Sequence, residues 1–338
     1  MEPTELDDAP PAAGAGFPLG DSRAEQLRYV LRYAALSPST RNTQPWRFRI
    51  VGDALELHAD RSRALPVLDP RGRELMMSCG AALLHVRVAL RTFGHEADVT
   101  TVPDGTDGDL VARVTVGASR PATRDDYALF RAMPRRHTHR GRFEARHLPP
   151  AVLGKLASAA EAEGALLRPL TGVERRSAAD LVVEGHGRQW RRRDFRRELA
   201  TWTRDNLTRR GDGLPGYALG LGDLASRLLP LAVSTLDLRA VRRVRRLALE
   251  APLLVVLATR EDDAAAWLAA GQATARVLLR ANVEHLSASF LNQAIQEPEL
   301  RGRFAEIVGA TPQLLLRVGY AGRTRATPRR AVQEIVNP

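Results

Sequence analysis

The strongest constraint on the fold is a pattern that occurs twice: an apolar strand, then a long apolar helix that carries Gly-x-Ala. The strand "ALELHAD" precedes the helix 73–94, which contains Gly80 and Ala82. The strand "APLLVVLAT" precedes the helix 264–286, which contains Gly271 and Ala273. A helix that is apolar on most faces is buried. We therefore expect two buried units and interpret them as a weak internal duplication, although two buried units of this kind can also look alike for physical reasons alone.

Shorter elements surround these two helices. A helix is predicted over 22–36, where Ser22 and Glu25 form a capping box and Pro38 ends the helical pattern. "WRFRIV" and "ALELHAD" are expected to form a hairpin. Strands are also expected at "EADVTTVP", "LVARVTVG", "ALLRPL" and "PQLLLRVGYAG", and a further helix at 148–164. Residues 171–250 interrupt the second unit with an amphipathic helix, a Gly-rich turn and a basic helix. This segment is either a lid over a site or a surface excursion.

The charge of the chain is strongly basic, with a formal net charge of +11 and a pI of about 10.9. Taken alone, this charge suggests nucleic acid as a partner. However, Lys155 is the one lysine among 50 basic residues, and the arginines are dispersed along the chain without a nucleic-acid-binding motif. We therefore expect no nucleic-acid partner, and phosphate on a small ligand as the target of a few arginines.

Other broad classes of protein are disfavoured by simple features. Cys79 is the one cysteine, so neither an intramolecular disulfide nor a cysteine metal cluster is possible, and its apolar surroundings predict a buried thiol. No apolar run is long enough to predict a transmembrane helix, and we expect no membrane partner, no metal and a cytoplasmic location. Residues 1–20 are acidic and rich in Pro, Gly and Ala, and are expected to form a flexible tail.

Three polar segments are candidates for a ligand site. The loop "SPSTRNTQPWRF" (37–48) concentrates short hydrogen-bonding side chains, which is either turn chemistry or a cradle for a planar polar ligand. "PRRHTHRGRF" (134–143) offers fork-shaped donors suited to a phosphate, although an exposed charge run is an alternative. "TPRRAVQEIV" (327–336) places two arginines after a proline, and alone it is weak evidence.

Taken together and in this order, these segments resemble the nitroreductase superfamily, and more closely its Acg-like FMN-binding family. "LPVLDPRGRE" (65–74), "DGLPGYALG" (212–220), "SFLNQAIQEPELRGRF" (289–304) and "PQLLLRVGY" (312–320) support the resemblance, which covers nearly the whole chain from about residue 22. The resemblance implies an α+β, nitroreductase-like fold with central mixed sheets flanked by helices. It also implies two degenerate tandem copies in one chain, as in a fused dimer. The expected parts are the tail 1–20, a first half 21–130 and a second half 131–338 with the lid-like insertion 171–250.

The two halves are complementary in their motifs. The first half has the "NTQPW" loop but no "RRxT" segment, and the second half has "RRHT" but no such loop. We therefore infer one flavin site in each chain, and a monomer resembling a fused dimer or a weak homodimer. The resemblance implies that the FMN-binding residues are Ser37, Ser39, Arg41, Asn42, Gln44, Arg135, Arg136, Thr138, Arg140, Ser289, Leu291, Arg329 and Arg330.

Within these, the loop 37–48 would bond the pyrimidine edge or the ribityl hydroxyls, the arginines and Thr138 would hold the phosphate, and Ser289 and Leu291 would lie near flavin N5. The flavin carries the chemistry in this family, so no catalytic side chain is expected. The implied function is an FMN-dependent oxidoreductase that uses NADPH or NADH and transfers hydride to or from a small organic molecule. The alternative that the resemblance carries is an FMN-sequestering or storage protein with little turnover.

Overall fold

The computed structural model describes residues 16–101, 108–235 and 241–336. Residues 1–15 of the predicted tail lie outside these ranges. Phe17 is only 6% exposed, and its ring stacks on that of Phe93 with the ring centroids 4.3 Å apart. The packed part of the chain therefore includes residue 17, and the predicted tail boundary at residue 20 is too late.

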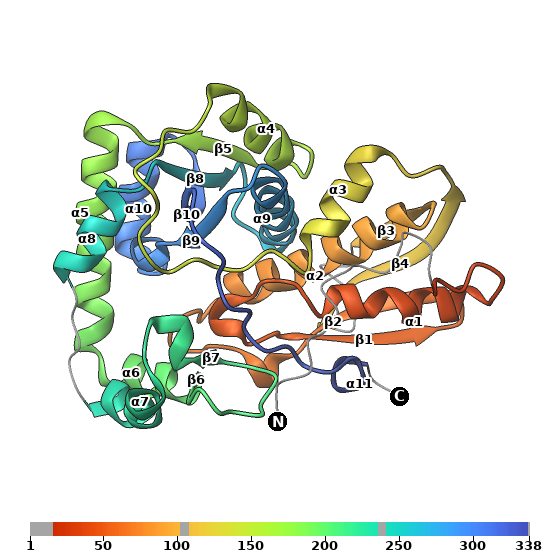
Figure 1. Ribbon diagram of the computed structural model, residues 1–338, viewed down its shortest axis with the longest axis horizontal. Helices are drawn as coiled ribbons and strands as arrows, with labels where there is room; N and C mark the ends of the chain where they lie inside the picture. Colours follow the sequence, from red (N-terminus) through yellow and green to blue (C-terminus); the bar gives the residue numbers. More distant parts are fainter. Residues whose placement is uncertain (1–15, 102–107, 236–240, 337–338) are drawn as a thin grey trace.

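Four antiparallel strands form the first sheet, in the order β1-β2-β4-β3. The hairpin predicted at its start is confirmed, with Trp46 opposite Ala59 and Val51 opposite Ala54. The strands are β1 (Trp46–Val51), β2 (Ala54–Ala59), β3 (His95–Thr101) and β4 (Leu110–Ser119). The sheet shares one hydrophobic core with α1 (Arg23–Ala34), α2 (Arg73–Thr92) and α3 (Arg124–Ala132) (Figure 1).

The second sheet is covered by helices on both faces. Its strands, in the order β5-β8-β10-β9, are β5 (Leu166–Pro169), β8 (Leu253–Thr259), β10 (Thr311–Gly319) and β9 (Ser287–Phe290). One face packs against α4 (Pro150–Glu161) and α9 (Ala264–Val283). The other face packs against α5 (Gly172–Arg191), α8 (Val241–Leu249) and α10 (Pro298–Val308) (Figure 1).

The two sheets share a strand order. When the strands of each sheet are numbered along the chain, both orders are 1-2-4-3. In both sheets a 20-residue helix, α2 or α9, joins the second strand to the third. The α+β class is confirmed. The shared order is what tandem copies would give, but similar packing demands can also produce it, so the duplication stays a prediction.

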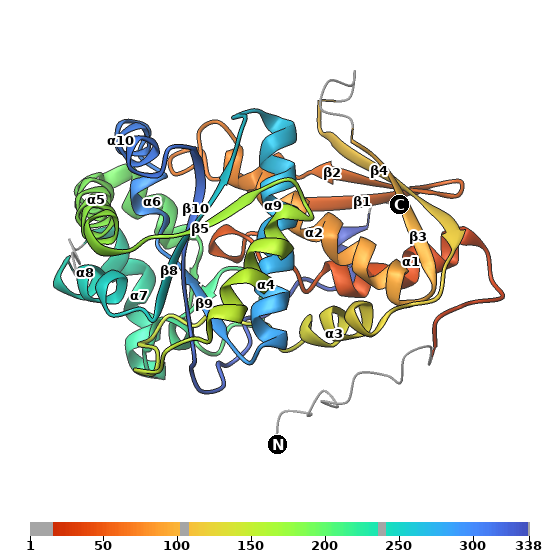
Figure 2. The same cartoon turned by 90° about the horizontal axis from the view of Figure 1, so that it is seen from above.

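The recurring glycines lie where α2 and α9 pack side by side in the centre of the molecule (Figure 2). A Cβ atom on Gly80 would lie 2.1 Å from the carbonyl oxygen of Leu268, and a Cβ on Gly271 would lie 2.1 Å from that of Met77. Only glycine permits such an approach of two backbones. Cys79, next to this contact, is fully buried, and burial raises the pKa of its thiol, as expected for a structural cysteine.

The expectation of mixed sheets is wrong for the strands within the described ranges. Every strand pair of the two large sheets is antiparallel. Parallel pairing at their edges is limited to isolated bridges, from Phe48 to Val336 and from Thr138 to Ala288. The reason is that the C-terminal segment and the loop around Thr138 pass the sheet edges at single points and do not continue as strands. The C-terminal segment nevertheless carries the second half of the chain back to β1, where α11 (Val332–Ile335) lies (Figure 1).

The predicted lid-like insertion (171–250) has two different parts. The helices α5 and α8 belong to the core of the second sheet, so they are not a flap. The part between them contains α6 (Arg193–Thr201), η3 (Gly216–Leu219), α7 (Asp223–Thr235) and the short parallel pair of β6 (Thr203–Arg204) and β7 (Leu214–Pro215). This middle part packs against the loop 38–44 of the first half, as the hydrogen bonds described below establish.

Candidate functional site

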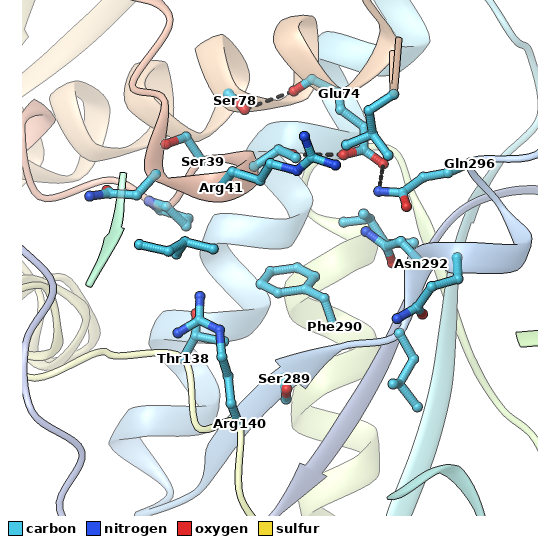
Figure 3. Close-up of a pocket in the computed structure, with 18 of the residues that line it drawn as sticks. Ser39, Arg41, Glu74, Ser78, Thr138, Arg140, Ser289, Phe290, Asn292 and Gln296 are labelled. Atoms are coloured by element: carbon cyan, nitrogen blue, oxygen red, sulfur yellow. Dashed lines mark hydrogen bonds between the residues drawn. The ribbon is translucent and has the colours of Figure 1, made fainter. Parts of the chain in front are cut away.

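A cavity of ≈ 400 Å³ is lined by both halves of the chain. This volume is within the range of small-molecule sites, roughly 300–1,000 Å³. Its walls come from the loop 38–42 and α2 in the first half, and from the loop 136–140 and the residues that follow β9 in the second half (Figure 3). The C-terminal segment and the insertion complete it, through Arg325, Thr327 and Arg329 and through α5, α6, β7 and α8.

The loop of the first half has an unusual backbone. Arg41, Asn42 and Gln44 have φ angles of 52°, 57° and 51°. This left-handed conformation is uncommon for residues other than glycine, and it persists only where the surroundings fix it. The loop is therefore held in its shape by contacts beyond its own sequence.

The side chain of Asn42 supplies much of that fixation. Its Nδ2 donates to the carbonyl oxygens of Gly213 and Pro328, each at 3.0 Å, and its Oδ1 accepts from Arg329 Nη1 at 3.2 Å. Asn42 thus joins the loop, the insertion and the C-terminal segment. We expected Asn42 to bond the flavin. It lines the cavity, and its amide already bonds these protein groups. A contact of Asn42 with a flavin stays a prediction.

Gln44 and Arg330 form a second joint behind the loop. Gln44 Nε2 donates to Gly211 O at 2.7 Å, and its Oε1 accepts from the backbone N–H of Arg330 at 2.9 Å. The guanidinium of Arg330 donates to the carbonyl oxygens of Gln44 and Glu334. Neither side chain lines the cavity. The structure therefore does not bring these two predicted ligand-binding residues to it.

Three arginines form a cationic end of the cavity. Arg136 is 5% exposed, and Arg140 and Arg329 are partly buried. Arg329 donates to neutral groups, including Thr327 Oγ1 at 2.7 Å, while the Nε atoms of Arg136 and Arg329 are buried without a partner. In the part of the chain that the structure describes, none of the three is paired with a carboxylate.

Burial of the three arginines lowers their pKa values. Burial lowers the pKa of Arg136 to about 9, and the charges of Arg329 and Arg140 contribute to this shift. Burial lowers the pKa of Arg140 and of Arg329 to about 10. Three desolvated cations that repel one another destabilise the protein unless an anion lies among them. An anion at this end of the cavity would be stabilised by all three guanidiniums.

Glu74 is the acidic side chain of the cavity lining within the described ranges. Its carboxylate accepts from Thr40 Oγ1 at 2.7 Å, from Gln296 Nε2 at 2.8 Å and from Arg73 Nη2 at 3.2 Å. Gln296 in turn accepts from Gln189 Nε2 at 2.9 Å. Figure 3 places Glu74 and Gln296 at the opposite end of the view from Thr138 and Arg140. The cavity is thus polar at both ends, with the positive charge concentrated at one.

The insertion supplies an apolar wall and an ion pair. Phe195 and Leu199 of α6 line the cavity. Arg41 Nη1 lies 3.0 Å from Glu198 Oε1, and its guanidinium lies over the ring of Phe195, 4.9 Å from the centroid. Glu198 also accepts from the backbone N–H of Val67 at 2.7 Å. Arg41 is consequently committed to the insertion, although we expected it to bond the ligand.

The sequence of the chain is similar to known proteins over almost its whole length. It is 32% identical over 336 residues to a Mycobacterium tuberculosis protein named "Putative NAD(P)H nitroreductase Rv3131", an alignment that covers 97% of this chain and 94% of that protein. The chain belongs to the nitroreductase family. A second M. tuberculosis protein, "Putative NAD(P)H nitroreductase acg", is 26% identical over 323 residues, covering 91% of this chain and 94% of that protein. The resemblance to nitroreductases of the Acg type is confirmed.

Two further comparisons add little to the nitroreductase assignment. No protein-family model matches the chain. Among solved structures, the FMN-dependent nitroreductase NfnB from Mycobacterium smegmatis in complex with NADPH is similar to it, with 18% sequence identity and a TM-score of 0.42, covering 62% of this chain and 96% of that chain. This similarity is too distant to transfer the position of any residue.

In this nitroreductase, most of the residues predicted to bind the ligand do line the cavity: Ser39, Arg41, Asn42, Arg136, Thr138, Arg140, Ser289, Leu291 and Arg329. Four do not, namely Ser37, Gln44, Arg135 and Arg330. Ser37 is fully buried, and its hydroxyl donates to Ala81 O at 3.3 Å. Arg135 is exposed, because the backbone turns after α3 and directs only its neighbour Arg136 inward.

Several cavity residues were not predicted from the sequence. They include Glu74 and Ser78 of α2, Gln189 and Trp190 of α5, and Asn292 and Gln296 after β9. Glu74 and Gln296 lie inside segments that carried the family resemblance, so the signal was present without an assigned role. Gln189 and Trp190 lie in the segment predicted as an amphipathic helix, whose pattern does not distinguish a cavity wall from a surface.

Proposed function

We propose that this nitroreductase binds one FMN in the cavity and acts as an NAD(P)H-dependent oxidoreductase on a small organic molecule. The observation that carries the proposal is the group of Arg136, Arg140 and Arg329. These three guanidiniums lie at one end of a cavity of ≈ 400 Å³ and lack a carboxylate partner within the described ranges. A phosphate monoester supplies the compensating charge that such a group requires.

The residues present fit FMN. The three arginines would hold its phosphate, and the hydroxyls of Ser39 and Thr138 are available to its polar groups. Ser39 Oγ accepts from the backbone N–H of Gln44 at 2.9 Å, which leaves its O–H free to donate. Ser289 lies in the edge strand β9, Leu291 follows this strand directly, and both residues line the cavity. Asn42, Gln44 and Arg330 would support the site indirectly, by fixing the loop and the C-terminal segment.

The division of labour follows from these contacts. FMN, when bound, supplies the two-electron hydride chemistry at its N5 atom. The chain orients the reactants and excludes water, through the apolar side chains of Phe195, Leu199, Leu291 and Leu314. Glu74 fixes the orientation of Thr40 and Gln296, because its two oxygens accept hydrogen bonds from them.

A stoichiometry of one FMN per chain is supported by the origin of the cavity walls. The loop 38–42 comes from the first half, whereas the loop 136–140 and Arg329 come from the second half. One chain thus contributes both kinds of wall to a single cavity. We therefore favour a monomer that resembles a fused dimer, or a weak homodimer, as the working unit.

A second candidate function is retention of FMN with little turnover. It is favoured by the contact of α6 with the loop, where Arg41 is paired with Glu198 and its guanidinium lies over the ring of Phe195. A wall fastened in this way would slow the entry of a second reactant. The same FMN-binding residues serve both functions. The two functions differ only in whether a second reactant can reach the bound FMN.

One experiment distinguishes them. The purified protein is assayed for bound FMN per chain, and is then mixed anaerobically with NADPH or NADH while the flavin absorbance is followed. About one FMN per chain and rapid bleaching support the oxidoreductase. One FMN without bleaching supports retention. A protein that binds no added FMN contradicts both.

A further inference from the structure

Helix α7 presents an apolar stripe to solvent. Leu224, Leu228 and Leu231 are 77%, 60% and 64% exposed. They are spaced by four and three residues, so they lie on one face of the helix. Leu207, in the loop that contacts this helix through Asn206, is 63% exposed. We call these four side chains the leucine stripe. A contiguous group of large exposed apolar side chains marks an interaction site in most soluble proteins.

The orientation of α7 is set by its opposite face. Ser226, Leu229 and Val233 are buried, and the hydroxyl of Ser226 accepts from the backbone N–H of Asn206 at 3.0 Å. Helix α7 packs against α6 (Figure 1), and α6 in turn lines the cavity. The helix therefore has a packed inner face, and rotation that would bury the leucine stripe would expose Leu229 and Val233.

Positive charge accompanies the leucine stripe. Arg227 is exposed and is spaced three residues from Leu224 and four from Leu231, so it lies on the same face. Arg209 and Arg210 are also exposed and follow Leu207 after Thr208. The carboxylates on the same two elements, Asp205 and Asp223, accept hydrogen bonds from Leu207 N and Asn206 Nδ2. The leucine stripe is thus accompanied by the cations Arg209, Arg210 and Arg227, which have no carboxylate partner within the described ranges.

This combination decides between two occupants. In a symmetric contact with a second copy of the chain, the same face meets itself, so these arginines would approach one another. Like charges opposed across an interface disfavour association. An anionic lipid surface takes both groups at once, because leucines enter the boundary of the acyl chains while arginines remain at the headgroups.

We propose that the leucine stripe of α7 docks the protein onto anionic lipid membranes as a peripheral contact. Within the described ranges, no helix is long and apolar enough to cross a membrane. A helix that lies in the interface does not need that length. The sequence alone led us to expect no membrane partner, because it was examined for spanning segments and not for an exposed face.

The test uses the full-length protein and vesicle flotation. Vesicles of phosphatidylcholine with phosphatidylglycerol are compared with vesicles of phosphatidylcholine alone. Binding is expected on the anionic vesicles, weakening as salt rises. The double variant Leu228→Ser and Leu231→Ser is expected to bind at least about tenfold more weakly, since each leucine loses its transfer into the apolar layer. Arg227→Gln is expected to cost about fivefold on anionic vesicles only.

A matched control replaces two exposed leucines elsewhere. Leu19 and Leu166 are 66% and 49% exposed, and Leu19→Ser with Leu166→Ser should float like the wild type. Thermal unfolding is measured for every variant, to verify that the fold is intact. Equal flotation of both double variants overturns the proposal, and so does the absence of binding to anionic vesicles. Sedimentation that reveals a dimer lost in the Leu228→Ser and Leu231→Ser variant would assign the face to a second copy instead.

Discussion

Arg41 and Glu198 form an ion pair between the two halves of the chain, 3.0 Å apart, with side chains that are only 8% and 9% exposed. Arg41 belongs to the loop with the left-handed backbone, and Glu198 belongs to α6 of the insertion. Burial lowers the pKa of Arg41, and the charge of Glu198 opposes that shift. The pair thus connects the cavity loop to α6. Because both side chains are buried, either charge without the other would destabilise the protein.

Glu198→Ala is expected to destabilise the protein by about 3–5 kcal/mol, because it leaves a buried guanidinium without its counter-charge. The measurement is the free energy of unfolding from urea titration. Asp180→Ala is the control, since Asp180 pairs with Arg245 at 3.0 Å in a largely exposed position. Loss of such a pair costs about 0–1 kcal/mol. Similar losses for both variants would contradict the assignment of the Arg41 pair as a structural joint.

The second prediction concerns Arg136 and Arg329. Arg136→Ala with Arg329→Ala is expected to raise the Kd for FMN at least about a hundredfold, since each charge-assisted hydrogen bond contributes about 1.5–3 kcal/mol. Riboflavin lacks the phosphate and should bind the variant and the wild type alike. The affinities are compared by quenching of flavin fluorescence. The substitutions relieve the repulsion between two buried cations but also remove the hydrogen bonds of Arg329 to Asn42 Oδ1 and Thr327 Oγ1. The free energy of unfolding of the flavin-free variant is therefore measured as well.

Arg330→Ala is the control for this experiment. Arg330 is buried and donates to the backbone oxygens of Gln44 and Glu334, so its loss should lower the free energy of unfolding. FMN and riboflavin should then be affected equally. If the double variant loses riboflavin as strongly as FMN, Arg136 and Arg329 are structural and the phosphate assignment is wrong.

The adjacent pair Arg329 and Arg330 illustrates what the sequence could and could not predict. The motif placed both arginines at the phosphate. In an extended segment, however, successive side chains point to opposite sides. The side chain of Arg329 therefore lines the cavity, while that of Arg330 donates to the backbone oxygens of Gln44 and Glu334. Arg135 and Arg136 also point apart, in their case because the backbone turns after α3. A pattern of residue types predicted the right segments, but the direction of each side chain depends on tertiary structure.

The two buried helices α2 and α9 were easier to predict than the close packing between them. Continuous apolar sequence predicted both α2 and α9, and the hairpin and strands followed from local pattern. The role of Asn42 could not be predicted in this way, because its partners Gly213 and Pro328 are far away in the sequence. The glycines were noted as a repeat, but their physical reason is the close approach of two helices, which only the structure reveals.

The third prediction tests that approach. Gly80→Ala is expected to destabilise the protein by about 1–3 kcal/mol or more, because its Cβ would lie 2.1 Å from the backbone oxygen of Leu268, which cannot rotate away. Gly154→Ala in α4 is the matched control. No atom lies within 4 Å of the Cβ that it adds, and alanine should stabilise that helix by about 0.5–1 kcal/mol. Thermal unfolding should therefore shift in opposite directions, and a Tm for Gly80→Ala equal to the wild type would contradict the tight crossing.

The last prediction concerns pH and Asp69, which precedes α2. Burial raises the pKa of this carboxyl to about 6, and the negative charge of Glu74 adds to the shift, although Asp69 Oδ2 accepts from the backbone N–H of Leu75 at 2.9 Å. The usual value is 3.8, so between about pH 4 and pH 6 the folded protein binds more protons than the unfolded chain. The stabilisation from this group is thus complete below pH 4 and is lost as the pH rises through 6.

Asp69→Asn keeps an acceptor for Leu75 N but removes the charge. The difference in free energy of unfolding between this variant and the wild type should increase in favour of the variant from pH 4 to pH 6, and then stay constant up to pH 8. Urea titrations at each pH measure it, and taking the difference cancels the groups that titrate alike in both proteins. A difference that does not change with pH would mean that Asp69 is ionised at its ordinary pKa. It would also mean that the negative charge of Glu74 does not raise the pKa of Asp69.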